Sequence, residues 1–258
     1  MHATEIKTIK PPSRLLVLGE FRAVWEHLAG IAAWPSLQRL APRGDGQRVL
    51  VLPGLLADDH STHLLRLFLR TRGYRAHGWG LGRNLGPRPG IEEGMVAKLR
   101  HLYQESGRKV SLVGWSLGGI YARMLGLQHP EWVRDVISLG SPVAGSPRAT
   151  NAWRIYERVS GRRANDPQRL EVVHQTPIVP TTSIYSRTDG VVAWQCSIEK
   201  AGPKTENIEV VASHTGLGAH PAVLYAIADR LAQPEGQWKP FDRGTFGPLV
   251  FPEPARLG

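Results

Sequence analysis

The sequence predicts an α/β domain with a mostly parallel sheet of about six strands and helices on both faces. Short, almost wholly apolar runs recur along the chain, as is typical of parallel strands that are buried on both faces. Segments with apolar residues at helical spacing separate these runs, and strands that alternate with helices form parallel sheets. The length of 258 residues is sufficient for one such domain with a full core.

The composition is that of a folded globular protein, with 41% hydrophobic and 21% charged residues. The net charge of +10 would suit a polyanion such as nucleic acid. The arginines are scattered from Arg14 to Arg256, however, without a long basic run or a nucleic-acid-binding motif. We therefore expect no nucleic-acid partner, while a weak attraction to anionic lipid or to an acidic substrate stays open.

Two features of the sequence bear on location and cofactors. Cys196 is the only cysteine, so the chain can form neither an intrachain disulfide nor a thiolate metal cluster. Residues 1–12 contain no apolar stretch followed by a small-residue cleavage site, and no apolar run in the chain is long enough to span a bilayer. These features predict a cytoplasmic protein without a metal site.

Residues 1–45 are predicted to form a helical segment packed on the domain, with one helix from Leu15 to Trp34. Pro35 is expected to end this helix. The alternative to packing on the domain is an interfacial helix, which makes a weak peripheral contact with a membrane or covers the active site. The apolar positions of the helix fall at spacings of three and four, at Val17, Phe21, Val24, Leu28 and Ile31.

The α/β domain is predicted over residues 46–232. Its strands are expected at residues 48–52, 74–79, 110–113, 136–139, 182–185 and 208–211, and its helices at residues 63–72, 91–105, 117–128 and 222–231.

The alternation of strands and helices lapses in residues 146–180. Aromatic and aliphatic residues follow helical spacing there, at Trp153, Ile155, Tyr156 and Val159. Inserts after strand ends overhang the binding crevice of such sheets, so we expect a small helical lid. Residues 233–258 are rich in proline and are predicted to form an irregular C-terminal tail.

The strongest functional signal is the run Gly114-Trp115-Ser116-Leu117-Gly118-Gly119, between an apolar strand and an apolar-periodic segment. In a nucleophile elbow, such a sharp strand-to-helix turn presents the serine oxygen at the carboxyl end of the sheet. Glycines flank the serine because side chains there would collide with the neighbouring strand and helix. The serine of this run, Ser116, is therefore the predicted nucleophile.

An oxyanion hole requires backbone N–H groups that point at the reacting carbonyl oxygen. One is expected from Leu117, the residue after the nucleophile, and a second from the loop after an earlier strand. Pro53-Gly54-Leu55 occupies that loop, so Leu55 is the predicted second donor. An ordinary Pro-Gly turn is the alternative interpretation.

The acid and the base are predicted on loops after the later strands. Asp189 follows the strand at residues 182–185 in a polar turn, where a carboxylate could hold the imidazole in its working tautomer. A simple turn aspartate is the alternative. His214 directly follows the last strand and is the predicted base, whereas His220 fits a helix cap. Nucleophile, acid and base then occur in the chain order expected for this arrangement.

Three further residues are candidates for the substrate pocket. Trp115 could either pack beneath the elbow or line the acyl site. Asn84 follows a predicted strand and could either reach the crevice or stabilise a turn. Trp153, in the predicted lid, could cover an acyl pocket.

With these motifs the chain resembles the α/β-hydrolase superfamily over residues 46–234, and within it the bacterial lipase- and esterase-type hydrolases. The resemblance rests on the strand-Pro-Gly-Leu-Leu opening, the Gly-Trp-Ser-Leu-Gly-Gly elbow and the Ser-His-Thr-Gly-Leu turn around His214. It implies the α/β-hydrolase fold and cleavage of esters or thioesters through an acyl-enzyme, without metal or cofactor. The chain departs from many relatives in having Pro53 where they have histidine, and an N-terminal helix where they have an antiparallel strand pair. Both departures concern the pocket and the substrate more than the triad.

The predicted function is hydrolysis of small-molecule or lipid esters, with Ser116 as nucleophile, His214 as base and Asp189 as acid. An acyltransferase or a thioesterase would use the same residues. A non-catalytic binding protein on this scaffold is an alternative of another class, and the complete set of motifs argues against it.

Overall fold

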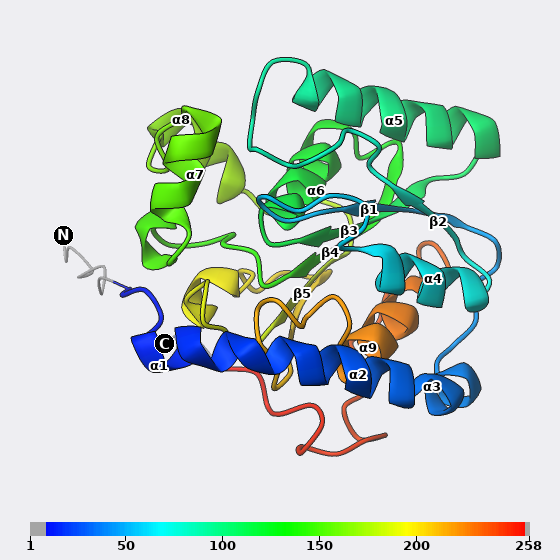
Figure 1. The fold of residues 1–258 in the computed structure, drawn as a ribbon. Helices are drawn as coiled ribbons and strands as arrows, with labels where there is room; N and C mark the ends of the chain where they lie inside the picture. Colours follow the sequence, from blue (N-terminus) through cyan, green and yellow to red (C-terminus); the bar gives the residue numbers. More distant parts are fainter. Residues whose placement is uncertain (1–8, 256–258) are drawn as a thin grey trace.

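The computed structural model describes residues 9–255, and a six-stranded sheet in the order β2-β1-β3-β4-β5-β6 forms its centre (Figure 1). The strands are β1 (Arg48–Leu52), β2 (Arg75–Gly78), β3 (Val110–Trp115), β4 (Val133–Leu139), β5 (Thr181–Tyr185) and β6 (Thr205–Glu209). Every neighbouring pair is parallel, which confirms the predicted α/β class. The predictions for residues 1–8 and 256–258, at the ends of the N-terminal segment and the C-terminal tail, lie outside the described residues.

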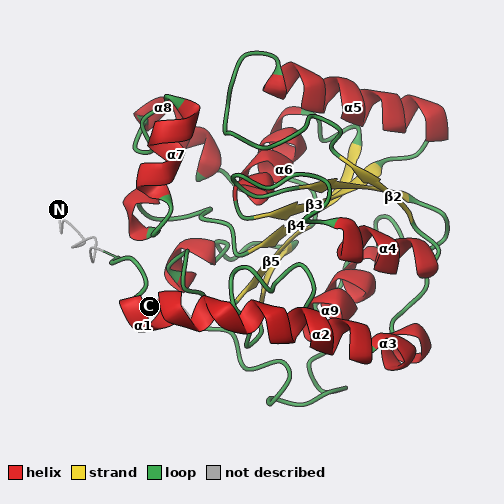
Figure 2. Cartoon of the chain, viewed as in Figure 1, coloured by secondary structure: helices red, strands yellow, loops and turns green. Residues whose placement is uncertain are grey.

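Helices cover both faces of the sheet, as predicted (Figure 2). One face carries α5 (Ile91–Ser106) and α6 (Leu117–Gln128), and the other carries α4 (His63–Thr71) and α9 (Pro221–Leu231). Successive residues of β1 point to opposite faces, so Leu50 joins the core under α5 and α6, and Val51 joins the core under α4 and α9. These two buried faces explain the continuous apolar run in this strand.

The last strand differs from its prediction. The apolar pattern predicts residues 208–211, but β6 begins at Thr205 and ends at Glu209, and Val211 is 55% exposed. β6 is the edge strand and pairs only with β5. An edge strand is not enclosed on all sides, so polar residues such as Asn207 can occupy it and the apolar run does not mark its ends.

The N-terminal segment is divided into shorter helices, so the prediction of one helix from Leu15 to Trp34 is wrong. It consists of α1 (Arg14–Gly19), the 3-10 helix η1 (Glu20–Arg22), α2 (Ala23–Ala32) and α3 (Trp34–Leu40). Pro35 does not end the helical segment. It lies in the first turn of α3, where a proline loses no intrahelical hydrogen bond.

The periodicity predicts that the apolar face of this segment packs on the domain. The opposite face packs there instead. The buried residues of α2 are Ala23, Glu26 and Gly30. A Cβ at Gly30 would overlap the carbonyl oxygen of Ala219, so the two backbones approach closely there. The predicted apolar positions instead face solvent, with exposed fractions from 41% to 79%: Val17, Phe21, Val24, Leu28 and Ile31.

The insert at residues 146–180 contains the 3-10 helix η2 (Pro147–Ala149) and the helices α7 (Trp153–Ser160) and α8 (Pro167–Val173). Figure 1 shows α7 and α8 side by side, and α8 contacts α6, where Arg123 donates to the backbone oxygen of Val173 at 3.3 Å. The 3-10 helix η3 (Trp194–Ser197) follows β5. The insert is therefore helical.

The described part of the C-terminal tail, residues 233–255, contains no helix or strand. It is nevertheless packed, since Phe241 and Phe251 are 4% and 1% exposed and their rings lie 4.7 Å apart. Phe246 lies edge-on to Tyr225 of α9 at 4.5 Å. The tail therefore completes the core on the α9 face of the sheet.

Candidate active site

Ser116 occupies the sharp turn between β3, which ends at Trp115, and α6, which begins at Leu117. Its backbone has φ 54° and ψ −119°, a conformation that is strained for residues other than glycine. In the described part of the chain, the only other non-glycine residue with a positive φ is Leu56, in the loop after β1. Strained residues cluster at functional sites, and these two lie on neighbouring strand ends.

Three glycines make this turn sterically possible. A Cβ at Gly114 would overlap the backbone of Gly118, and a Cβ at Gly118 would overlap the carbonyl oxygen of Leu52. A Cβ at Gly119 would overlap the hydroxyl group of Ser141. The strand, the turn and the helix are thus too close together for any side chain at these positions.

Asp189 and His214 form a buried hydrogen-bonded pair on the loops after β5 and β6. The Oδ2 atom of Asp189 lies 2.7 Å from Nδ1 of His214, and the two side chains are 2% and 7% exposed. The Oδ1 atom accepts the backbone N–H groups of Val191 and Val192 at 2.8 Å, which fixes the carboxylate. Burial lowers the pKa of His214, but the charge and hydrogen bond of Asp189 outweigh this effect and the pKa is raised. The imidazole can therefore accept a proton and hold it.

Trp115 and Gly140 place this pair beside the turn of Ser116. The indole Nε1 of Trp115 donates to the backbone oxygen of His214 at 3.1 Å, and the two rings are 6.0 Å apart. A Cβ at Gly140, directly after β4, would lie 3.0 Å from Oδ2 of Asp189 and 3.1 Å from Nδ1 of His214. Trp115 packs against the core and joins the turn to the loop of His214, which supports the first of its two predicted roles.

Leu55 and Leu117, the predicted oxyanion donors, lie on two segments that meet at Ser116. A Cβ at Gly54 would lie 3.3 Å from Cβ of Ser116, so the loop after β1 approaches the turn of Ser116 closely. Leu55, Ser116 and Leu117 line one pocket. Among the described residues, neither of the two leucine N–H groups donates to a protein acceptor, which leaves both for a ligand oxygen.

Asn84 stabilises the loop after β1 and does not line this pocket. Its side chain is fully buried, with Nδ2 donating to the backbone oxygen of Pro53 at 2.8 Å and Oδ1 accepting the N–H of Gly86 at 3.1 Å. Its backbone oxygen accepts the N–H of Leu56 at 2.7 Å. The candidate role of Asn84 in the substrate pocket is therefore wrong, because its amide is occupied by contacts within the protein. It stabilises the turn, as the alternative interpretation predicts.

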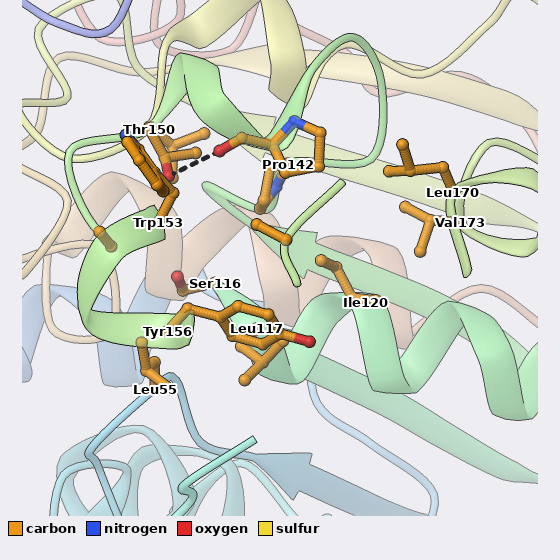
Figure 3. A pocket seen from close by; sticks show the side chains of 14 residues that line it. Leu55, Ser116, Leu117, Ile120, Pro142, Thr150, Trp153, Tyr156, Leu170 and Val173 are labelled. Atoms are coloured by element: carbon orange, nitrogen blue, oxygen red, sulfur yellow. Dashed lines mark hydrogen bonds between the residues drawn. The ribbon is translucent and has the colours of Figure 1, made fainter. Parts of the chain in front are cut away.

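An apolar pocket opens beside Ser116 (Figure 3). Much of its lining comes from the insert, with Trp153 and Tyr156 of α7 and Leu170 and Val173 of α8. Figure 3 shows these side chains directed at a common space, which Ile120 of α6 also borders. A mostly apolar lining next to one hydroxyl group suits a ligand with an apolar part and one polar reacting group.

Glu20 of the N-terminal segment joins the loop of Asp189 to the loop of His214. Its carboxylate accepts the N–H of Gly190 at 2.8 Å, the N–H of His214 at 2.9 Å, and both the N–H and the hydroxyl group of Thr215 at 2.9 and 2.8 Å. Burial raises the pKa of Glu20, but these hydrogen bonds outweigh it and the pKa is lowered. Glu20 is therefore ionised at neutral pH.

Glu26 and Arg22 extend this contact. Glu26 accepts the backbone N–H of Ser213 at 2.9 Å and also its hydroxyl group. Arg22 pairs with Glu26 at 3.0 Å and donates to the backbone oxygen of Thr188 at 2.9 Å. No signal in the sequence identifies these residues, because glutamates beside an apolar stripe normally mark the solvent face of a helix.

His220, the second histidine after β6, is not part of the Asp189–His214 pair. His220 is the N-cap of α9, and its Nδ1 accepts the N–H of Ala222 at 3.3 Å. Burial lowers the pKa of His220. The structure thus pairs only His214, of these two histidines, with Asp189.

Within residues 9–255, no three or more histidine, cysteine, aspartate or glutamate side chains converge in a way that could hold a metal ion. Every helix in the same range is too short or too polar to be a transmembrane span. Cys196 is buried, and burial raises the pKa of its thiol to about 11, so the thiol is protonated at neutral pH.

A family of known proteins matches the part of the chain that carries this site. The sequence model of the PGAP1-like alpha/beta domain matches residues 91–217, which include Ser116, Asp189 and His214. No curated protein sequence matches the chain significantly.

Solved structures of lipases and other hydrolases share the fold. Lipase B of Aspergillus fumigatus superposes with a TM-score of 0.60 at 16% identity, over 76% of this chain and 54% of that one, so the chain spans little more than half the length of that lipase. Lipase BlEst2 of Bacillus licheniformis gives 0.53 at 20% identity, over 76% and 95%. The pyrethroid hydrolase PytH gives 0.51 at 19% identity, over 74% and 99%. At such identities the likeness concerns the fold.

Proposed function

This chain has the α/β-hydrolase fold, and we propose that it is a serine hydrolase of carboxylic esters. The observation that carries the proposal is the buried Asp189–His214 pair, 2.7 Å apart, which the indole of Trp115 links to the strained turn of Ser116. A carboxylate that orients an imidazole beside a partly exposed serine is the arrangement that activates a hydroxyl group as a nucleophile.

In the proposed mechanism, His214 takes the proton of the Ser116 hydroxyl while the oxygen of Ser116 forms a bond to the acyl carbon. The N–H groups of Leu55 and Leu117 stabilise the negative charge on the former carbonyl oxygen. The intermediate then releases the alcohol, which receives the proton from His214, and the acyl group stays on Ser116. Asp189 stabilises the protonated imidazole.

Water completes the cycle. His214 takes a proton from the water molecule as the water oxygen attacks the acyl carbon. The bond from the acyl group to Ser116 then breaks. The serine oxygen recovers its proton from His214, and the carboxylic acid leaves. A thioesterase would differ only in the group that leaves first, and an acyltransferase only in using an alcohol or amine in place of water.

The lining of the pocket indicates which kind of ester could bind. Its apolar lining from α7 and α8 suits an ester with an apolar acyl chain, either a small molecule or a lipid. We further propose that the enzyme acts in the cytoplasm, which fits its single, buried cysteine.

A series of p-nitrophenyl esters with increasing acyl length tests the proposal. We expect hydrolysis by the wild type and a loss of about a thousandfold or more in kcat for Ser116→Ala. Ser61→Ala, at an exposed serine in the loop after β1, is the matched control and should keep wild-type turnover. An added alcohol that diverts the acyl group from water would identify an acyltransferase. Equal activity of Ser116→Ala and the control would contradict the proposal.

A further inference from the structure

The N-terminal segment has two faces with opposite chemistry. Every exposed residue between Leu15 and Ala32 is apolar, and the exposed residues of this stretch are named the apolar stripe here. The largest of them, Phe21 and Trp25, are 79% and 72% exposed. The acidic side chains of the same stretch, Glu20 and Glu26, point to the domain and bind the loops that carry the proposed acid and base.

The apolar stripe is too extended to be an ordinary part of a solvated surface. Figure 1 shows α1 and α2 end to end as one rod at the edge of the molecule, and residues 14–32 span roughly 28 Å at the helical rise per residue. Single exposed apolar side chains are common on proteins, but a contiguous apolar surface marks an interaction site. The hydrogen bonds and the close backbone approach that hold the segment on the domain come from other residues, Glu20, Glu26 and Gly30.

The charges around the stripe indicate what covers it. Exposed cationic side chains stand before it at Lys10 and Arg14 and after it at Arg39, and no exposed acidic residue lies within residues 9–40. The whole chain carries a net charge of +10. Anionic lipid headgroups attract such a surface, whereas two copies of the chain would repel each other. Tryptophan and phenylalanine are also the side chains that anchor helices in the boundary between headgroups and acyl chains.

We propose that α1 and α2 lie on an anionic lipid surface, with Phe21 and Trp25 inserted at the boundary of headgroups and acyl chains. The other side of the same helical turns holds the loops of Asp189 and His214 through Glu20. A helix with its side chains is about 10 to 12 Å across, so docking keeps these loops about one helix diameter from the lipid. The docking does not depend on the proposed hydrolase function. If both hold, esters carried in a lipid surface are the substrates within reach.

Vesicle binding tests the docking without catalysis, so it can be measured on Ser116→Ala protein as well as on the wild type. We expect co-sedimentation with vesicles of equal parts phosphatidylcholine and phosphatidylglycerol, and weaker binding at high salt because screening reduces the attraction. The double substitution Phe21→Ser with Trp25→Ser should lower the partition coefficient of the protein between vesicles and water about a hundredfold. The variant lacks the two large apolar side chains whose transfer from water into the lipid favours binding.

Leu249→Ser is the matched control, since Leu249 is 93% exposed and lies outside the apolar stripe. It should bind vesicles as the wild type does. Both variants change solvent-facing side chains and should keep the melting temperature of the wild type, which shows that they are folded. The proposal is overturned if the wild type does not bind, if it binds phosphatidylcholine alone equally well, or if the double variant binds unchanged. A wild-type dimer that the double substitution dissociates would assign the stripe to a second copy and overturn it too.

Discussion

Glu20→Gln tests whether a residue outside the proposed triad positions it. The carboxylate of Glu20 accepts four hydrogen bonds of 2.8 to 2.9 Å, from Gly190, His214 and twice from Thr215. Glutamine has the same size, but only one of its terminal atoms is an acceptor, and its NH₂ group would face backbone donors. About half of these hydrogen bonds should be lost, and the rest lose the assistance of the charge.

The contacts set the size of the effect on stability. A hydrogen bond to a charged group contributes about 1.5–3 kcal/mol, and Glu20 is half-buried, so water offsets part of the loss. We expect the free energy of unfolding to fall by about 2 kcal/mol at neutral pH. The folded-state pKa of Glu20 is lowered, so its contribution is complete above the ordinary carboxyl pKa and is lost as the pH falls through the folded value. The difference in stability between wild type and variant should therefore shrink in acid.

The effect on catalysis is separate from the effect on stability. Glu20 holds the backbone of His214, so a displaced imidazole should lower kcat about tenfold or more, with a smaller change in KM. Burial lowers the pKa of His214, whereas the charges of Asp189 and Glu20 raise it. Removing the charge of Glu20 should lower this pKa and move the acidic limb of kcat/KM to lower pH.

The assay is the pH profile of kcat and kcat/KM on a soluble p-nitrophenyl ester, with urea unfolding of the same proteins. Glu253→Gln, at an exposed glutamate, should change neither the pH profile nor the stability to urea. Glu26→Gln should lower stability through its lost contact with Ser213, with less effect on the acidic limb. A Glu20→Gln protein that is less stable but keeps its kcat and its acidic limb would show that Glu20 is only structural and would refute the reasoning.

Three further substitutions address the acid, the insert and the second histidine. Asp189→Asn should lower kcat on the same ester about a thousandfold or more in a folded protein, because the imidazole loses the carboxylate that orients it; an unchanged rate would place the acid elsewhere. Trp153→Ala should alter the preference for acyl length across the ester series more than it alters the melting temperature, since Trp153 lines the pocket; a loss of stability alone would assign it to packing. His220→Ala should cost about 1 kcal/mol of stability, as expected for a lost helix cap, and should keep turnover; a large loss of turnover would give His220 the role that His214 has here.

The centre of the sheet and the sharp turn at Ser116 are predictable because local pattern and tertiary packing agree there. β1 and β3 are buried on both faces, so most of their residues are apolar. The turn at Ser116 requires glycines at fixed positions, and these are visible in the sequence. Asp189 and His214 can be predicted because each follows a strand, and parallel strands bring their carboxyl ends to one edge.

The N-terminal segment could not be predicted because its periodicity and its packing conflict. Phe21 and its apolar neighbours give the pattern of a helix that faces a core, but they face solvent. Glu20 instead binds backbone groups that lie 170 and 194 positions away in the chain. A carboxylate can accept from any backbone N–H, so no local pattern specifies such a partner. Asn84 is similar in one respect, since the acceptor of its buried amide, the backbone oxygen of Pro53, lies 31 positions away in the chain.

Labelling with a fluorophosphonate tests most directly whether Ser116 is a nucleophile activated by His214. We predict that the wild type takes up one label, which peptide mass spectrometry places on Ser116, and that Ser116→Ala takes up none. His214→Ala should react about a thousandfold or more slowly, because nothing then removes the serine proton. Ser61→Ala should react as fast as the wild type. An unlabelled wild type, or a label that persists on another residue in Ser116→Ala, would contradict the assignment.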